Sequence, residues 1–288
     1  MVLFTSSRPL DRAENIKAVY DAYPGRKKFI QKGDTAASSP QFSIMVTDEL
    51  VNTSPGKCIF ISHGMGACKT YGLDQPNRYF HCPEVITYAT ASSEDLVPLV
   101  ASQCGIPESK VIPLGMPRTD AYFDGVTDDG TYLYAPTFRS GQWIPDWEKI
   151  DRNIDGHLLA KPHMVTNTLN AKGEHITEVS NKETSAPYLK KCRTLVTDYS
   201  SIMFDAMVLR KPVVLFAKDK EQYLRQRGIY YPYPDMYSDV FCDTEESLCD
   251  ALPLAKWSDK DEERRLFHAG ACDGHSTERV VELIRSLL

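Results

Sequence analysis

Residues 194–216 read TLVTDYSSIMFDAMVLRKPVVLF. The short apolar run through Leu195 and Val196 is typical of a buried strand. From 202 to 209 the apolar residues recur at helical spacing, which predicts about two turns of helix, and Pro212 ends it. A second apolar run follows at 213–216. This order of strand, turn, helix and strand predicts one βαβ unit.

The turn between the first strand and the helix is rich in hydroxyl groups. Asp198, Ser200 and Ser201 are helix-capping residue types, and capping is the simpler interpretation of the two serines. The start of a helix also presents unpaired N–H groups and the positive end of the helix dipole. The same turn therefore predicts a phosphate site at the carboxyl end of the strand.

Composition narrows the class of protein. A length of 288 residues suggests two domains, and 42% hydrophobic residues are enough for a full core. The net charge of −6 argues against a basic nucleic-acid binder. No apolar run approaches the roughly 18 residues of a membrane span, and the N-terminal MVLFTSSR is too short for a signal peptide. We expect a cytoplasmic protein whose first residues form a core strand.

The metal-binding residue types show no spacing typical of a metal site. The eight cysteines include no Cys-x-x-Cys pair, and the seven histidines include no His-x-x-x-His pair. We expect reduced, mostly buried thiols. Asp198 and Asp205 are interpreted as a helix cap and a helix-face charge. The sequence therefore predicts neither a metal nor a cofactor.

Strands and helices alternate along both halves of the chain, which predicts an α/β fold with parallel sheets. The turn-rich segment DGVTDDG at 124–130 marks the expected boundary between domains 1–125 and 126–288. An amphipathic helix capped at Ser276 or Thr277 is expected to close the chain. A cluster of tyrosines at 223–237 is expected to pack a loop over the second domain, with base stacking as the alternative.

Two histidines stand where predicted strands end. His63 follows the strand at 57–62, and an imidazole there can accept a proton at neutral pH. His163 ends the segment at 158–163 and could donate a hydrogen bond to phosphate. A purely structural histidine is the alternative at both positions.

Several short blocks, in order along the chain, resemble the CDP-glycerol glycerophosphotransferase family, whose members build teichoic acids and related glycerol-phosphate polymers. The most specific block is TDYSSIMFD at 197–205. In the His-Gly loop, Met65 replaces the family's usual Thr, and Pro162 precedes His163 where the family has proline after the histidine. The other blocks are HGMGACKTYG at 63–72, GMPRTD at 115–120, APTFR at 135–139, KPH at 161–163 and DGHSTERV at 273–280.

The resemblance implies two Rossmann-like domains in a glycosyltransferase-B arrangement, facing a cleft, with the C-terminal helix near the domain junction. The first domain would serve the acceptor and the second the nucleotide donor. Glycerol phosphate would pass from CDP-glycerol to a hydroxyl group, with release of CMP. The resemblance implies His63 and His163 as catalytic residues, Ser200, Ser201, Arg139, Thr197 and Asp198 at the donor diphosphate, and Gly64, Lys69 and Thr137 near the substrate.

Other interpretations stay open at this point. The donor could carry ribitol, and the acceptor could be a lipid-linked teichoic acid, a capsular glycan or a soluble polyol phosphate. The sequence contains no basic amphipathic segment of the kind that binds a bilayer. Peripheral contact with the inner face of the plasma membrane stays an open alternative. A nucleotide-sugar glycosyltransferase or epimerase of the same fold is the rival enzyme, and a catalytically idle binding module is the rival of another class.

Overall fold

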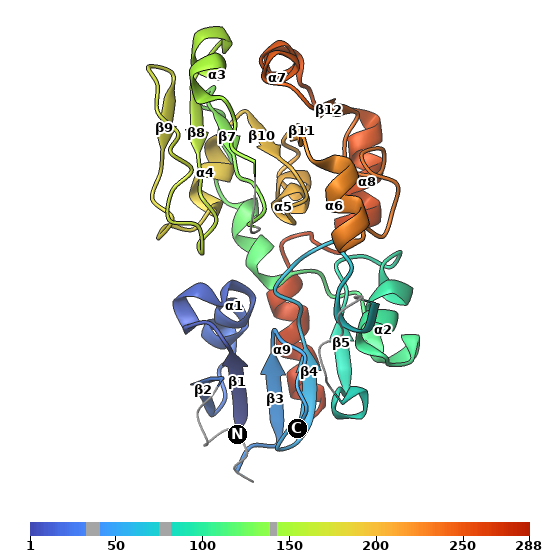
Figure 1. Ribbon diagram of the computed structural model, residues 1–288. Helices are drawn as coiled ribbons and strands as arrows, with labels where there is room; N and C mark the ends of the chain where they lie inside the picture. The colour runs from blue at the N-terminus through green and yellow to red at the C-terminus, as the bar shows by residue number, and fades with distance from the viewer. Residues whose placement is uncertain (33–40, 75–81, 139–142) are drawn as a thin grey trace. The chain divides into compact units, whose positions relative to one another are not determined.

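The computed structural model describes residues 1–32, 41–74, 82–138 and 143–288. The chain forms two compact units, one from Met1–Asp124 with Leu266–Leu288 and one from Gly125–Arg265. Among the described residues each unit contains one six-stranded sheet (Figure 1), and every strand pair in both sheets is parallel. The predicted α/β class with two parallel sheets is confirmed.

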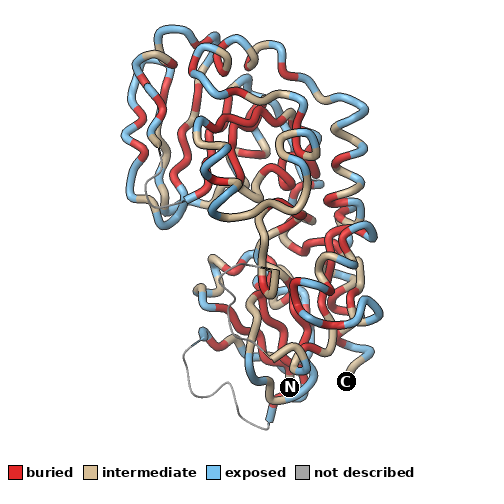
Figure 2. Tube along the Cα trace, turned by 45° about the vertical axis from the view of Figure 1, so that its right-hand side comes forward, coloured by how far each residue is buried: buried red, intermediate tan, exposed pale blue. Residues whose placement is uncertain are grey.

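The first unit has the strand order β2-β1-β3-β4-β5-β6. Its strands are β1 (Val2–Ser6), β2 (Lys27–Gln31), β3 (Ile44–Thr47), β4 (Lys57–Phe60), β5 (Tyr88–Thr90) and β6 (Val111–Ile112). Every residue of β1 and β3 is buried, as expected for strands with both faces covered. Figure 2 shows this buried core running along the strands.

Two helices from opposite ends of the chain cover one face of this sheet. The apolar sides of α1 (Glu14–Ala22) and α9 (Ser276–Ser286) share a core cluster with strand residues of β1, β3 and β4. A third helix, α2 (Val97–Cys104), packs in a cluster with residues of β4, β5 and β6 and ends at Gly105, whose φ of 68° suits glycine.

The position of α9 differs from the sequence-based expectation. Residues 126–288 were expected to form the second domain, but Leu266–Leu288, which include α9, belong to the first unit. Its first N–H groups are not capped by Ser276 or Thr277. The carboxylate of Asp120 accepts hydrogen bonds from the backbone N–H of Ser276 at 3.0 Å and of Thr277 at 2.7 Å. The buried apolar face of α9 and its cap by Asp120 together hold the C-terminal helix in the first unit.

The second unit has the strand order β12-β11-β10-β7-β8-β9. Its strands are β7 (Tyr132–Tyr134), β8 (Leu158–Ala160), β9 (Ile176–Glu178), β10 (Thr194–Thr197), β11 (Val213–Phe216) and β12 (Val240–Cys242). The predicted βαβ unit is present as β10, α5 (Ile202–Val208) and β11, with Leu195 beside Val213 in the parallel register.

The helices of the second unit are α3 to α8. Their bounds are α3 (Trp147–Asn153), α4 (Ala186–Lys191), α5, α6 (Lys220–Arg227), α7 (Glu245–Ala251) and α8 (Asp259–Ala269), and the chain returns to the first unit within α8. Both α3 and α7 share the core cluster that contains Tyr134 and Phe216.

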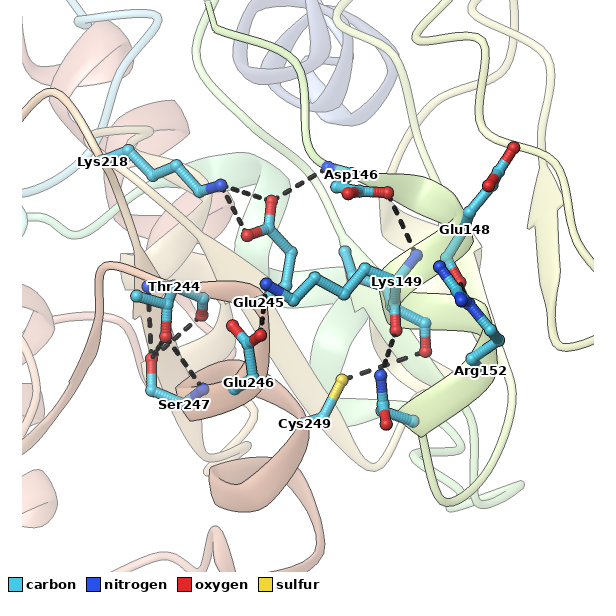
Figure 3. A network of polar contacts seen from close by, with 12 residues as sticks. Asp146, Glu148, Lys149, Arg152, Lys218, Thr244, Glu245, Glu246, Ser247 and Cys249 are labelled. Carbon is cyan, nitrogen blue, oxygen red and sulfur yellow. Dashed lines mark hydrogen bonds and ion pairs between the residues drawn. The ribbon is translucent and has the colours of Figure 1, made fainter.

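A polar network joins α3, α7 and the end of β11 (Figure 3). The buried carboxylate of Glu245 pairs with Lys218 and accepts the backbone N–H of Asp146 at 2.9 Å. Asp146 in turn caps α3 through the N–H of Lys149, and Thr244 caps α7 through the N–H of Ser247. The buried carboxylate of Glu245 is thus paired with a cation and a backbone donor, as buried charged groups usually are.

No helix in the described parts of the chain has both the length and the apolar composition required to cross a bilayer.

Candidate functional site

In the first unit, three neighbouring strands bring polar residues to one edge of the sheet. The carboxyl ends of β1, β3 and β4 lead into Ser6–Arg8, Asp48 and Ser62–Gly64 respectively. In open parallel α/β sheets this edge is where ligands bind. Residues far apart in the sequence therefore meet around His63.

The hydrogen bond of His63 defines which ring nitrogen carries the proton. Its Nδ1 lies 3.3 Å from the backbone carbonyl oxygen of Asp48. A carbonyl oxygen only accepts hydrogen bonds, so Nδ1 is the protonated nitrogen of the neutral ring. The other nitrogen, Nε2, then carries a lone pair, and the residue is exposed to solvent. This tautomer suits a general base acting through Nε2.

The surroundings of His63 keep its ring neutral. Desolvation and the positive charges of Arg8 and Arg118 lower its pKa to about 4, against the opposing hydrogen bond to Asp48. Since the residue is exposed, the lowered pKa reflects crowding by neighbouring atoms rather than full enclosure. At neutral pH the imidazole is therefore able to accept a proton.

A buried amide ties the backbone just before His63 to the segment that carries Arg118. The Nδ2 atom of Asn15, in α1, donates to the carbonyl oxygen of Ser62 at 2.9 Å, and its Oδ1 accepts the backbone N–H of Arg118 at 3.0 Å. The guanidinium of Arg118 donates to the carbonyl oxygen of His63 at 2.9 Å. Asn15 and Arg118 thus position the loop without contacting the imidazole nitrogens.

Asp48 is an acidic residue that the sequence-based site did not include. It is 2% exposed, and its Oδ2 accepts the hydroxyl of Ser6 at 3.1 Å. Its Oδ1 has no hydrogen-bond partner among the described residues. Burial raises the pKa of this carboxyl group to about 6. The available sequence signal was an aspartate placed directly after a buried strand.

In the second unit, β10, β7 and β8 are neighbours, and their carboxyl ends bring together most of the predicted donor residues. The Thr197 hydroxyl donates to the carbonyl oxygen of Ala135 at 2.6 Å. One carboxylate oxygen of Asp198 accepts the N–H of Thr137 at 2.7 Å and of Tyr199 at 2.6 Å. Both Thr197 and Asp198 are buried, and their hydrogen bonds hold the loop after β7 against the turn after β10.

The capping interpretation of Ser201 is wrong. Helix α5 starts at Ile202, and Ser201, at its N-cap position, makes no side-chain capping hydrogen bond. Within the described residues, the Ser200 hydroxyl likewise makes no hydrogen bond. Both serines are half-buried. Their hydroxyl groups remain available to a ligand at the end of β10.

His163 carries its proton on the other ring nitrogen from His63. Its Nδ1 accepts the backbone N–H of Val165 at 3.4 Å, and its ring stacks on Phe138 with centroids 6.0 Å apart and planes 28° apart. The neutral ring therefore carries its proton on Nε2, which makes it a hydrogen-bond donor. Such a donor suits a phosphate oxygen.

The remaining predicted residues fall into three groups. Gly64 and Lys69 lie on the same loop as His63 and are half-buried. Thr137 is buried, and its hydroxyl has no partner among the described residues. Arg139 lies outside the described residues. No group of three or more His, Cys, Asp or Glu residues that could hold a metal ion occurs in the described segments.

Known proteins share both the sequence pattern and the fold. The family described as CDP-Glycerol:Poly(glycerophosphate) glycerophosphotransferase matches residues 37–286. The teichoic acid ribitol-phosphate polymerase TarK of Staphylococcus aureus is 29% identical over 269 residues, covering 78% of this chain and 51% of that protein. A teichoic acid glycerol-phosphate primase of Bacillus subtilis is 26% identical over 238 residues, covering 72% of this chain and 62% of that protein.

A solved structure extends the likeness to the fold. The wall teichoic acid polymerase TagF superposes with a TM-score of 0.80 at 18% sequence identity, covering 99% of this chain and 88% of that structure. The chain spans about half the length of TarK and of the related polymerase TarL.

Proposed function

The chain belongs to the CDP-glycerol:poly(glycerophosphate) glycerophosphotransferase family, and we propose that it transfers glycerol phosphate from CDP-glycerol to an acceptor hydroxyl, releasing CMP. The acceptor is a teichoic-acid-like or capsular polymer bearing a free hydroxyl group, either lipid-linked or soluble.

The observation that carries this proposal is the pair of complementary histidine tautomers. His63 offers an unprotonated Nε2 beside the carboxyl edge of the first sheet, and His163 offers an Nε2–H at the corresponding edge of the second. One suits the removal of a proton from an alcohol, and the other suits stabilisation of phosphate charge.

In the proposed reaction, the acceptor oxygen attacks the glycerol-bearing phosphorus of the donor. A new oxygen–phosphorus bond forms as the bond to CMP breaks, and the hydroxyl proton passes to Nε2 of His63. His163, with the hydroxyl groups of Ser200 and Ser201, would hydrogen-bond the diphosphate. Alignment of the reacting groups and stabilisation of the developing charge supply most of such a catalysis.

Thr197 and Asp198 would support the donor site indirectly. Since both are buried and bonded to the loop backbone, they would hold Thr137 and Tyr199 in place. Arg139, which follows Phe138 in the sequence, is retained as a candidate phosphate ligand because a guanidinium pairs bidentately with phosphate.

A ribitol-phosphate transferase using CDP-ribitol is the second candidate. It is favoured by the relatives TarK and TarL of Staphylococcus aureus, both named as ribitol-phosphate polymerases and both 29% identical to this chain. The two candidates share the leaving group and the proposed base.

A panel of donors tests the proposal. CDP-glycerol, CDP-ribitol, UDP-sugars and GDP-sugars are incubated with the protein and a polyol-phosphate acceptor, and nucleotide release is followed. We expect CMP from CDP-glycerol at the highest rate. Preference for CDP-ribitol would select the second candidate, and turnover of UDP-sugars alone would refute both.

A further inference from the structure

Arg8 is a cation at the edge of the first sheet whose side chain has no hydrogen-bond or ion-pair partner among the described residues. The residue lies two positions beyond the end of β1 and is half-buried. Its guanidinium group makes no hydrogen bond or ion pair with any residue in the described ranges. Burying part of an unpaired charge costs free energy, so such a group is expected where an anionic ligand completes it.

Hydrogen bonds through Ser6 and Asp48 link the backbone of Arg8 to the proposed base. The backbone N–H of Arg8 donates to the Ser6 hydroxyl at 3.1 Å, and that hydroxyl donates to the Asp48 carboxylate at 3.1 Å. The carbonyl oxygen of Asp48 then accepts from Nδ1 of His63. The positive charge of Arg8 also contributes to lowering the pKa of His63.

The neighbouring charged residues already have their own contacts. Lys32 pairs with Glu49 at 2.8 Å, and Glu49 also accepts the N–H of Ser7 at 3.2 Å. Arg118 donates to the carbonyl oxygen of His63. The Asp48 carboxylate attracts Arg8, but the two form no ion pair, and its 2% exposure shields it from an incoming anion.

We propose that Arg8 binds a phosphate group of the acceptor and so presents the acceptor's terminal hydroxyl to Nε2 of His63. A guanidinium donates two parallel hydrogen bonds to a phosphate, which restricts both the position and the orientation of the ligand. The ligand class is a polyol phosphate with a free hydroxyl near its phosphate. This inference rests on the proposed transfer reaction.

Kinetics with two acceptors test the assignment. One acceptor is a polymer end carrying a glycerol phosphate unit, and the other is the same glycan without phosphate. For Arg8→Ala we expect the KM of the phosphorylated acceptor to rise about 10- to 100-fold, because a charged hydrogen-bonding partner is lost. The KM of CDP-glycerol and the KM of the neutral acceptor should not change. Arg8→Lys should give an intermediate KM for the phosphorylated acceptor, since lysine keeps the charge but cannot donate two parallel hydrogen bonds.

The matched control is Arg12→Ala, which removes a positive charge four residues after Arg8. The Nε atom of Arg12 lies 4.0 Å from the carboxylate of Asp11. This control should leave the KM of the acceptor unchanged. Equal rises in the KM of donor and acceptor for Arg8→Ala, or no rise at all, would overturn the role of Arg8.

Binding of glycerol 3-phosphate separates this inference from the transfer reaction. Calorimetry should detect binding to the wild type and a loss of at least about tenfold in affinity for Arg8→Ala. Absence of CMP release by the wild type, with this binding difference intact, would refute the reaction but not the anion site. Equal binding to both proteins would refute the anion site.

Discussion

The Nδ1 atom of His63 lies 3.3 Å from the backbone carbonyl oxygen of Asp48. This contact uses the main chain of Asp48, so the buried carboxyl group of the same residue is left to interact with Ser6 and Arg8. The backbone of Asp48 therefore sets the tautomer of the imidazole, while its carboxyl group interacts with other residues. The two roles of Asp48 can be tested separately.

Replacing Asp48 with Asn should change how stability depends on pH. The folded-state pKa is raised from 3.8 to about 6, so the neutral carboxyl stabilises the wild type below pH 3.8. That contribution, about 3 kcal/mol, is lost as pH rises towards 6. Asp48→Asn removes this titration, and urea unfolding should show it gaining stability relative to wild type between pH 4 and 7.

The control for Asp48→Asn is Glu49→Gln. Despite desolvation, hydrogen bonds from Lys32 and Ser7 and the charge of Lys32 lower the pKa of Glu49, so its ionised form stabilises the folded protein above its unfolded pKa. Glu49→Gln should therefore lose, not gain, relative stability as pH rises. A parallel pH dependence for both variants would contradict the assignment of the buried carboxyl.

His163→Gln should keep more activity than His163→Asn. The amide nitrogen of Gln reaches approximately the position of Nε2 and can still donate to phosphate, whereas that of Asn corresponds to Nδ1. We expect kcat of CMP release to fall roughly tenfold or less for Gln and by about 10²-fold or more for Asn. Equal losses in the two variants would show that the proton on Nε2 is not the feature used.

Ser201→Ala should weaken donor binding while leaving stability nearly unchanged. Since its hydroxyl makes no capping bond, the free energy of unfolding should change by less than about 0.5 kcal/mol. Thr244→Ala is the matched control, because Thr244 does cap α7 and its loss should cost about 1 kcal/mol. The KM of the donor should rise only for Ser201→Ala, and the reverse pattern would restore the capping interpretation.

Asn15→Ala should lower kcat through the loop that carries His63. The substitution removes hydrogen bonds to Ser62 and Arg118 from a residue that is 3% exposed, so the free energy of unfolding should fall by about 1–3 kcal/mol. The KM of CDP-glycerol should not change. Asn153→Ala, which removes a surface amide bonded to Lys149 at 2.7 Å, should affect neither kcat nor KM.

Local sequence patterns predicted the sheets well because the strands are short, apolar runs separated by turn residues. They placed the βαβ unit at 194–216 and the two histidines at strand ends, as observed. Two residues of the tyrosine cluster pack on a ring in the turn after β10. Tyr223 stacks on Tyr199 with ring centroids 3.7 Å apart, and Tyr233 packs on the same ring at 5.1 Å.

The features that escaped prediction depend on partners distant in the sequence. Asp120 caps a helix that begins more than 150 residues later, and so local reasoning assigned the cap to Ser276 or Thr277. Asn15 and Asp48 became site residues only when helix packing and strand order brought them to the loop of His63. Hydrophobic periodicity locates elements, but it carries no information on which polar groups meet at a sheet edge.

The most direct test of the account is the rate of CMP release from CDP-glycerol, with a polyol-phosphate acceptor, by the wild type and by His63→Asn. The Asn side chain can still donate to the carbonyl oxygen of Asp48, so the loop should keep its structure while the base is lost. We predict a fall in kcat of about 10²- to 10⁴-fold with the donor KM unchanged. A variant that releases CMP at the wild-type rate would contradict the role of His63, and a wild type that releases none would contradict the proposed reaction.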